Sequence, residues 1–340
     1  MNRDLPVILG AGGFIGGRLA TVLLERGHTV RLFDRAYKRN HVSALKRFEG
    51  RYELVEGNLE SPADLEKAIK GTSAVFHFIS SSVPVTSPLM LDVEVEVNLP
   101  NTLKIIHTML EFGVERIIFP SSGGAIYGEC GFANIKESVP ANPVGAYGMG
   151  KLLVEETLRY YRRAAGLKDL IARISNGYGA RDRTTFRQGA IDAFIMRHWE
   201  GKPVPLWGDG SAVRDYVYID DIITALVRLY EGGVYGIEVN VGSGIGYSLK
   251  DVISIIEKAS GIPVKIEPME GMYTGLRRNV LDVHRLEETT GYRATTSLEE
   301  GISRCWDAIT CLGRIDATQL PFGILQGHTM WPESELLGPF

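Results

Sequence analysis

The feature that most restricts the fold of this chain is a glycine-rich turn close to the N-terminus. The apolar run L5-P-V-I-L9 leads into G10-A-G-G-F-I-G16, and apolar residues then recur at helical spacing over residues 18–26. These segments predict a β-strand, a tight turn and an α-helix in that order. Such a unit places a helix N-terminus beside the end of a strand, an arrangement that binds the pyrophosphate of a dinucleotide.

The three glycines of the turn have separate predicted roles. Gly10 allows the sharp bend, Gly13 lets the backbone approach a pyrophosphate, and Gly16 lets the helix pack closely on the sheet. Phe14 and Ile15 lie between Gly13 and Gly16, so we expect them to contact the cofactor as well. A plain loop is the alternative, and the strand and helix in register on either side argue against it.

The residues at the end of the second expected strand, Asp34 and Arg35, bear on whether the cofactor is NAD or NADP. Residues 29–34 have the pattern of a strand, and Asp34 ends it about 20 positions beyond the turn. A carboxylate there takes the ribose hydroxyls and repels a 2′-phosphate, which predicts NAD. Arg35 follows immediately, and because an arginine could accept a 2′-phosphate, NADP stays open.

Strand-like and helix-like segments alternate through the first half of the chain. The strand-like runs cover residues 51–56, 74–78, 116–119 and 169–174, and a helical segment covers residues 61–69. This alternation predicts an α/β fold of the Rossmann type with a doubly wound parallel sheet. Ligands of such sheets bind beyond the carboxyl ends of the strands. The candidate binding residues near those ends are Asn58, Leu59, Phe78, Ser80, Ser122 and Asn176.

Tyr147 and Lys151 form the candidate catalytic pair. They lie four residues apart in A146-Y-G-M-G-K-L-L-V-E-E156, and residues at this spacing share one helix face. The Lys151 ammonium would favour the phenolate of Tyr147 and lower a pKa that is about 10 in an unperturbed tyrosine. A tyrosine of that kind is a general base. Together with the dinucleotide turn, the pair indicates a nicotinamide-dependent oxidoreductase, although many unrelated helices contain a Tyr and a Lys at this spacing.

Charge and cysteine content argue against several other classes of protein. A net charge of −4 disfavours binding to nucleic acid or to an anionic membrane. Three cysteines without a C-x-x-C pair and seven histidines without ligand spacing disfavour a disulfide scaffold and a metal site. The N-terminus leads directly into the first expected strand without space for a signal peptide, and no apolar run reaches the length of a membrane span. We therefore expect a cytoplasmic protein.

The chain resembles the extended short-chain dehydrogenase/reductase family, and within it the nucleotide-sugar epimerases of the UDP-glucose 4-epimerase type. The similarity spans roughly residues 5 to 310. Besides the glycine turn, Asp34 and the Tyr147/Lys151 pair, it rests on H77-F-I-S80, Asn98, S121-S-G-G-A-I-Y-G128, R173-I-S-N-G-Y-G179, G208-D-G-S-A-V-R-D-Y-V-Y-I-D-D221, N240-V-G-S-G244 and R277-R-N-V-L-D282.

The resemblance also implies how the chain is divided. An NAD-binding Rossmann domain would cover residues 1–178, and segments near 215–245 would return to it. A smaller, interleaved α/β domain, mainly residues 179–312, would bind the substrate. The tail from 313 to 340 lies outside the resemblance, and the protein would be a homodimer.

By this resemblance the candidate residues have individual roles. Tyr147 is the acid/base, Lys151 holds the nicotinamide ribose, and Ser122 or a neighbour hydrogen-bonds a sugar hydroxyl. Asn176 and Arg214 contact the nucleotide diphosphate.

Three positions depart from the family pattern. Gly123 stands where many relatives have the catalytic Ser or Thr, which moves that role to Ser122. Asn58 stands where an Asp commonly contacts the adenine, and its amide can still form a hydrogen bond there. Met272 replaces an arginine that grips the diphosphate. That charge would then come from one of three other residues, Arg277, Arg278 or Arg181.

Two asparagines each have two interpretations. Asn98 precedes Pro100, so it either caps a helix that restarts there or belongs to the active site. Asn279 matches a position that gates the pocket beside carbon 2 of the sugar. An asparagine there, smaller than the tyrosine of some relatives, would admit an N-acetyl group; alternatively, Asn279 is a surface or turn residue.

The residue at position 125 bears on the type of reaction. Dehydratases and decarboxylases of this superfamily carry an acidic residue two positions before the tyrosine that corresponds to Tyr127, and here that residue is Ala125. Elimination of water would lack its proton carrier, whereas oxidation and re-reduction need only Tyr147, NAD and a hydroxyl donor. We therefore expect an NAD-dependent epimerase that acts at carbon 4 of a UDP-hexose or UDP-N-acetylhexosamine. The alternatives are an NADP-dependent nucleotide-sugar reductase and a catalytically silent NAD-binding sensor.

Overall fold

The fold is built around a parallel sheet of seven strands in the order β10-β6-β5-β4-β1-β2-β3. A computed structural model describes residues 4–37, 45–81, 91–131, 133–179, 189–269 and 276–314. The seven strands are β1 (Pro6–Leu9), β2 (Val30–Asp34), β3 (Tyr52–Glu56), β4 (Ala74–His77), β5 (Arg116–Ser122), β6 (Lys168–Ile174) and β10 (Ile237–Val241). The predicted Rossmann-type α/β fold is confirmed.

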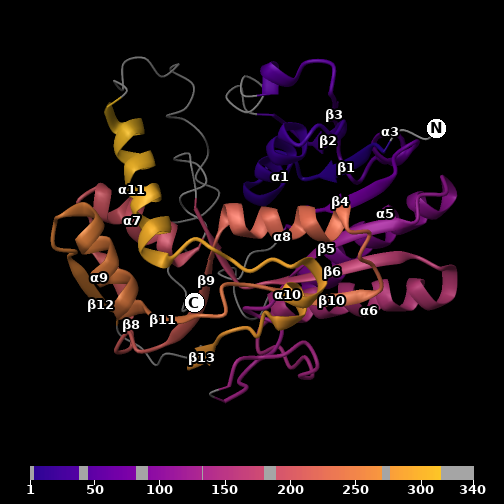
Figure 1. The fold of residues 1–340 in the computed structure, drawn as a ribbon. Coiled ribbons are helices and arrows are strands. Elements are labelled where there is room, and N and C mark those ends of the chain that lie inside the picture. The colour runs from indigo at the N-terminus through magenta and orange to yellow at the C-terminus, as the bar shows by residue number, and fades with distance from the viewer. Residues whose placement is uncertain are drawn as a thin grey trace.

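Helices cover both faces of this sheet (Figure 1). One face packs against α1 (Phe14–Glu25) and α8 (Ile219–Glu231), and the other packs against α3 (Pro62–Ile69), α5 (Leu99–Glu111) and α6 (Ala146–Ala165). Successive strand residues point to opposite faces, so their side chains belong to different apolar clusters. The neighbouring central strands β1 and β4 are buried along their whole length, because helices cover both of their faces.

The second half of the chain adds smaller sheets and a group of helices beside the main sheet (Figure 1). In one small sheet the central strand β9 pairs with three others, antiparallel to β11 and parallel to β7 and β13. These strands are β7 (Asn176–Tyr178), β9 (Val213–Tyr218), β11 (Gly246–Ser248) and β13 (Arg278–Asn279). A second small sheet pairs β8 (Val204–Trp207) with β12 (Ile266–Met269). The helices α7 (Ala190–Trp199), α9 (Leu249–Ser260) and α11 (Leu298–Arg314) pack against one another.

Short helical elements complete the described part of the chain. They are η1 (Lys46–Phe48), α4 (Leu91–Val93), the π-helical turn η2 (Glu94–Asn98) and α10 (His284–Thr290). Although β10 follows the small strands in sequence, it pairs with β6 in the main sheet. The two parts therefore interleave in space, and the domain boundaries at 178 and 312 stay a prediction. No helix in the described ranges is long and apolar enough to cross a membrane.

The order of the strands indicates where a ligand would bind at their carboxyl ends. The chain runs outward in one direction from β1 to β2 and β3, and in the other from β4 to β5 and β6. β1 and β4 are neighbours, so the order reverses between them. In doubly wound sheets a ligand binds at this reversal, and the glycine turn after β1 lies there.

Candidate active site

The turn after β1 is shaped for close approach of backbone and ligand. Gly10 has a φ of 91°, a conformation that favours glycine, and a Cβ there would lie 3.0 Å from the Phe78 carbonyl carbon. A Cβ on Gly16 would overlap the Gly10 carbonyl oxygen. Helix α1 begins at Phe14 with Gly13 as its N-cap and has no acidic residue in its first turn. The positive end of the helix dipole therefore faces the turn and favours an anion there.

Asp34 is held against this turn. Its Oδ2 accepts a hydrogen bond from the Gly12 N–H at 2.8 Å, and its Oδ1 accepts one from the Arg35 N–H at 2.7 Å. Each carboxylate oxygen keeps a second lone pair for a ribose hydroxyl. The Arg35 side chain is exposed. The carboxylate thus lies beside the glycine turn, which suits NAD.

The other candidate cofactor residues line the ends of β3 and β4. Phe78 is half-buried beside Gly10, and Ser80 is exposed. Asn58 is exposed, and its Oδ1 accepts a hydrogen bond from the Glu60 N–H at 3.2 Å. The Leu59 side chain is only 5% exposed and belongs to the core, which leaves its backbone for contact with a cofactor.

Tyr147, Lys151 and Ser122 come together at the carboxyl end of β5. Lys151 Nζ lies 5.5 Å from the centre of the Tyr147 ring and donates a hydrogen bond to the Pro120 carbonyl at 3.1 Å. The same ammonium lies 4.7 Å from the centre of the Phe119 ring. The Ser122 hydroxyl hydrogen-bonds the Tyr147 phenol. The three side chains predicted to be catalytic therefore form one cluster.

The ionisation of this cluster differs from the sequence prediction. Burial raises the pKa of Tyr147, the carboxylate of Glu94 raises it further, and the bond from Ser122 lowers it in part. Burial lowers the pKa of Lys151 to about 8, against the opposing charges of Glu94 and Glu155. The expectation of a lowered Tyr147 pKa is wrong, because loss of hydration on burial outweighs the other influences on the phenol.

The two serines at the end of β5 point in opposite directions. Ser121 is 4% exposed, and its Oγ donates a hydrogen bond to Glu155 Oε1 at 2.6 Å in the interior. Ser122, the next residue of the strand, points the other way, toward Tyr147. A Cβ on Gly123 would lie 2.5 Å from Leu281 Cδ1, so a Ser or Thr there would displace the leucine. The geometry therefore favours Ser122 as the hydroxyl of the site.

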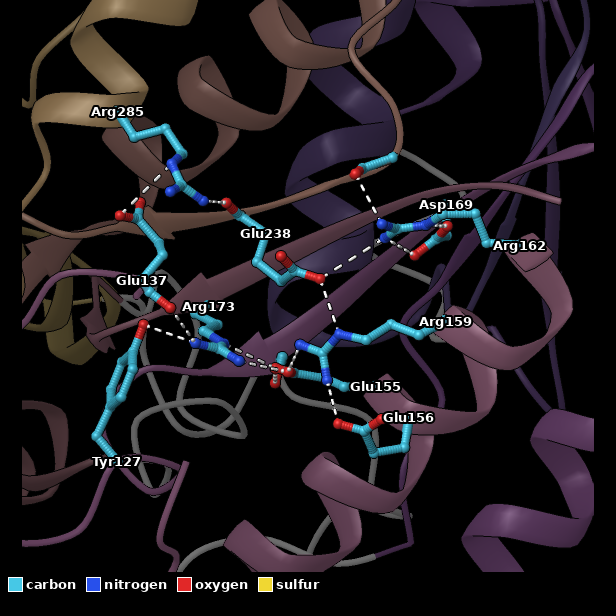
Figure 2. Close-up of polar contacts among 12 residues, drawn as sticks. Tyr127, Glu137, Glu155, Glu156, Arg159, Arg162, Asp169, Arg173, Glu238 and Arg285 are labelled. Carbon is cyan, nitrogen blue, oxygen red and sulfur yellow. Dashed lines mark hydrogen bonds and ion pairs between the residues drawn. The ribbon is translucent and has the colours of Figure 1, made fainter. Parts of the chain in front are cut away.

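A buried network of charges supports this end of the sheet (Figure 2). Arg173 on β6 donates hydrogen bonds to both oxygens of Glu155, at 3.0 and 2.6 Å, and to the Tyr127 hydroxyl at 2.9 Å. Arg159 donates to Glu155 Oε2 at 2.8 Å. The Tyr127 hydroxyl donates to Asn240 Oδ1 on β10 at 2.7 Å. The network connects α6, β6, β10 and the segment that carries Ser122.

The candidate substrate residues lie on the small sheet next to this cluster. Asn176 Nδ2 donates a hydrogen bond to the Asp215 carbonyl at 3.0 Å. In the register of the two parallel strands, Arg214 of β9 lies opposite Asn279 of β13. Asn279 is fully buried, and its Nδ2 donates to the Gly123 carbonyl at 3.1 Å. The interpretation of Asn279 as a surface or turn residue is therefore wrong. Its Oδ1 has no hydrogen-bond partner within the described ranges.

Of the arginines that could bind the diphosphate in place of Met272, two lie within the described residues. Arg277 is exposed, and its backbone N–H donates to Glu129 Oε2 at 3.0 Å. Arg278 is half-buried, and its Nη2 donates to Asn134 Oδ1 at 2.8 Å. Arg181 and Met272 lie outside the described residues.

Asn98 does not cap a helix. Its backbone dihedrals are helical, and its side chain forms no capping hydrogen bond on α5. Its Oδ1 instead accepts a hydrogen bond from the Ser81 N–H at 2.9 Å, and its Nδ2 donates to Glu94 Oε2 at 2.8 Å. Between the two interpretations, the cap is wrong, and Asn98 is connected to a carboxylate that acts on Tyr147 and Lys151.

Two acidic residues of this region had no predicted role. Glu94 is 4% exposed, and its charge raises the pKa of both Tyr147 and Lys151, the candidate catalytic pair. Asp215 is fully buried and accepts hydrogen bonds from the Ser243 N–H at 2.8 Å and the Leu281 N–H at 3.2 Å, which holds β9 to its neighbouring segments. The sequence shows only that Asp215 follows the candidate Arg214, and it contains no signal for Glu94.

Comparison with known proteins gives a family match over most of the chain. The model of the NAD dependent epimerase/dehydratase family matches residues 7–242. The chain is 30% identical over 304 residues to the UDP-glucose 4-epimerase of Mycolicibacterium smegmatis, over 88% of this chain and 96% of the relative. It is 29% identical over 315 residues to the dTDP-4-dehydro-6-deoxyglucose reductase of Escherichia coli, over 91% and 99% of the two chains.

A solved structure supports the same grouping. The UDP-glucose 4-epimerase of Thermus thermophilus in complex with NAD matches with a TM-score of 0.79 and 28% identity, over 90% of this chain and 99% of the other. Epimerases and a reductase of nucleotide sugars are thus both similar to this chain.

Proposed function

This chain belongs to the NAD dependent epimerase/dehydratase family, and we propose that it epimerises a nucleotide sugar at carbon 4. The substrate is a UDP-hexose or UDP-N-acetylhexosamine, and the cofactor is NAD. The observation that carries the proposal is the cluster of Tyr147, Lys151 and Ser122 at the carboxyl end of β5. Ala125 supports epimerisation over dehydration, because it puts no carboxyl group two residues before Tyr127.

The residues of the glycine turn fit the cofactor. The Gly10 and Gly16 backbones approach as closely as a pyrophosphate-binding turn requires, and Asp34 is tied beside them. Bound NAD would supply the hydride acceptor for carbon 4 of the sugar and the source of the same hydride for the opposite face. Lys151 would hold the nicotinamide ribose, as in the family that the chain resembles.

The protein's own residues handle the proton. Tyr147 removes it from the 4-hydroxyl and gives it back in the second half of the reaction, and Ser122 orients that hydroxyl. The positive charge of Lys151 stabilises the phenolate while the proton is away. Asn176, Arg214 and Arg277 would bind the diphosphate. The homodimer and the cytoplasmic location expected from the sequence belong to this proposal and stay predictions.

Asn279 bears on which sugars are accepted. Its Oδ1 is a buried acceptor without a partner in the described part of the chain, and the N–H of an acetamido group could satisfy it. The side chain also takes less room than a tyrosine would. We therefore expect UDP-N-acetylhexosamines to be substrates alongside UDP-hexoses.

Protein purified without added cofactor should contain bound NAD and convert its substrate without any addition, because the hydride must return to the same sugar. The test is incubation with UDP-glucose, UDP-galactose, UDP-N-acetylglucosamine and UDP-N-acetylgalactosamine, followed by chromatography and by assay of the nucleotide released on denaturation. The Tyr147→Phe variant is the control for contaminating activity. An empty protein that reduces a dTDP-4-keto sugar only with added NADPH would establish the reductase instead.

Ser122→Ala should reduce turnover by about tenfold to a hundredfold, because it removes one hydrogen bond to a group that becomes charged. Ser121→Ala should leave turnover nearly unchanged, since that hydroxyl is bonded to Glu155 in the interior. The two variants are a matched pair, and kcat measured on the best sugar of the panel distinguishes them. A larger loss in Ser121→Ala would show that the other hydroxyl serves the site.

A further inference from the structure

A buried carboxylate lies behind the catalytic pair. Glu94 begins the π-helical turn η2 and is 4% exposed. Burial of a carboxylate costs free energy unless other groups compensate it, and π-helical turns occur frequently at functional sites. We therefore expect the negative charge of Glu94 to stabilise a neighbouring group.

The helix that carries the pair has a glycine where Glu94 approaches. A Cβ on Gly150 would overlap Glu94 Oε2 and its carboxyl carbon. Gly150 stands between Tyr147 and Lys151 on α6, and a glycine inside a helix costs about 1 kcal/mol relative to alanine. The close approach of the carboxylate to α6 accounts for this glycine, because a Cβ at this position would displace the carboxylate.

Asn98 fixes the carboxylate from its own side. The hydrogen bond from Asn98 Nδ2 to Glu94 Oε2 is 2.8 Å long, and Asn98 is held in turn by the Ser81 N–H at 2.9 Å. Glu94 is thus oriented by the segment after β4 as well as by its own turn. These hydrogen bonds hold the Glu94 carboxylate toward α6.

The elements around Tyr147 and Lys151 carry other ionisable side chains besides Glu94. Glu155, one turn beyond Lys151 on α6, also favours the charged form of Lys151, although Arg173 and Arg159 bind its oxygens. His77 on β4 is buried, and burial together with the charge of Lys151 lowers its pKa to about 3, so it is neutral. Asp92 on α4 is exposed. Glu94 is therefore the acidic neighbour that acts on both members of the pair.

We propose that Glu94 is a positioning residue of this active site, and that its carboxylate keeps Lys151 in the ammonium form beside Tyr147. Burial has already brought the pKa of Lys151 down to about 8. Without the charge of Glu94, Lys151 would lose much of its own charge near pH 7, and the phenolate of Tyr147 would lose its stabilising neighbour. The catalytic consequence rests on the proposed function, whereas the charge of Lys151 can be measured without any substrate.

Glu94→Gln should lower the pH at which Lys151 loses its proton by about one unit, the size expected for removal of one charge at short range. Competitive acetylation of the purified holoprotein across pH, read by mass spectrometry of the peptide that contains Lys151, measures this midpoint. Glu96→Gln is the matched control, because Glu96 lies on the same turn but is exposed. An equal midpoint in wild type and Glu94→Gln would overturn the proposal.

The pH profile of kcat provides the catalytic test. The carboxylate raises the pKa of Tyr147 and opposes the lowering at Lys151, so its loss should move both limbs of the profile to lower pH. A merely structural role would reduce kcat at every pH without moving the limbs, and that result contradicts the proposal. If Glu94→Gln does not fold, Gly150→Ala displaces the carboxylate sterically and should lower the Lys151 midpoint in the same direction. Absence of activity in wild type together with a shifted Lys151 midpoint would reject the epimerase function and keep the role of Glu94.

Discussion

Tyr147→Phe should reduce turnover by roughly a hundredfold to ten-thousandfold, the usual contribution of a general acid/base, while the fold and the bound NAD persist. The substitution removes only the hydroxyl that accepts and returns the proton, and the ring remains to fill its place on α6. The measurement is kcat on the best substrate of the sugar panel, with melting temperature and released NAD determined on the same samples.

Tyr161→Phe is the matched control for this prediction. Tyr161 lies on the same helix, but its hydroxyl hydrogen-bonds His107 Nε2 at 2.7 Å at the surface, away from the cluster. Its loss should leave kcat unchanged. Near-normal turnover in Tyr147→Phe would contradict the mechanism, and loss of bound NAD in that variant would show that the change acted on the cofactor.

Arg173→Met should lower the free energy of unfolding by about 3 kcal/mol, because it leaves a buried carboxylate with less than its full compensation. Burial would by itself lower the pKa of Arg173, yet the bonds to Glu155 raise it. Glu155 is fully buried and would keep its bonds from Arg159 and Ser121. These remaining partners place the expected loss at the lower end of the range for broken buried ion pairs. Chemical denaturation of both proteins measures it.

An exposed ion pair provides the comparison for this substitution. Arg47 Nη2 lies 2.6 Å from Glu25 Oε1, with the two side chains 61% and 42% exposed. Arg47→Met should change stability by no more than about 1 kcal/mol. If Arg173→Met also falls within that limit, the network in Figure 2 does not stabilise the end of the sheet as its geometry indicates.

The cofactor half of the site was predictable because its signals are local. The glycines at 10, 13 and 16 act within one turn, and Asp34 ends a strand at a spacing that the βαβ unit determines. Tyr147 and Lys151 could be predicted as a pair for the same reason, since a spacing of four residues places two side chains on one helix face.

The ionisation of the site could not be predicted in this way. The sequence shows Lys151 near Tyr147 but not how far each is removed from water, and burial together with the Glu94 carboxylate raises the Tyr147 pKa. Ser121 and Ser122 have identical side chains, so the sequence does not distinguish them. Their positions on β5 decide that Ser122 faces Tyr147 and Ser121 faces Glu155.

The sequence by itself determined the Rossmann-type sheet, and it predicted the glycine turn as a phosphate site and Tyr147 and Lys151 as a catalytic pair, because each depends on residues a few positions apart. The tertiary structure alone decided the contacts that join distant segments. Glu94 reaches α6 at Gly150 across 56 positions, and Asn279 reaches the Gly123 carbonyl across 156. Such contacts depend on how helices and strands pack after they form, and no periodicity or spacing along the chain encodes them.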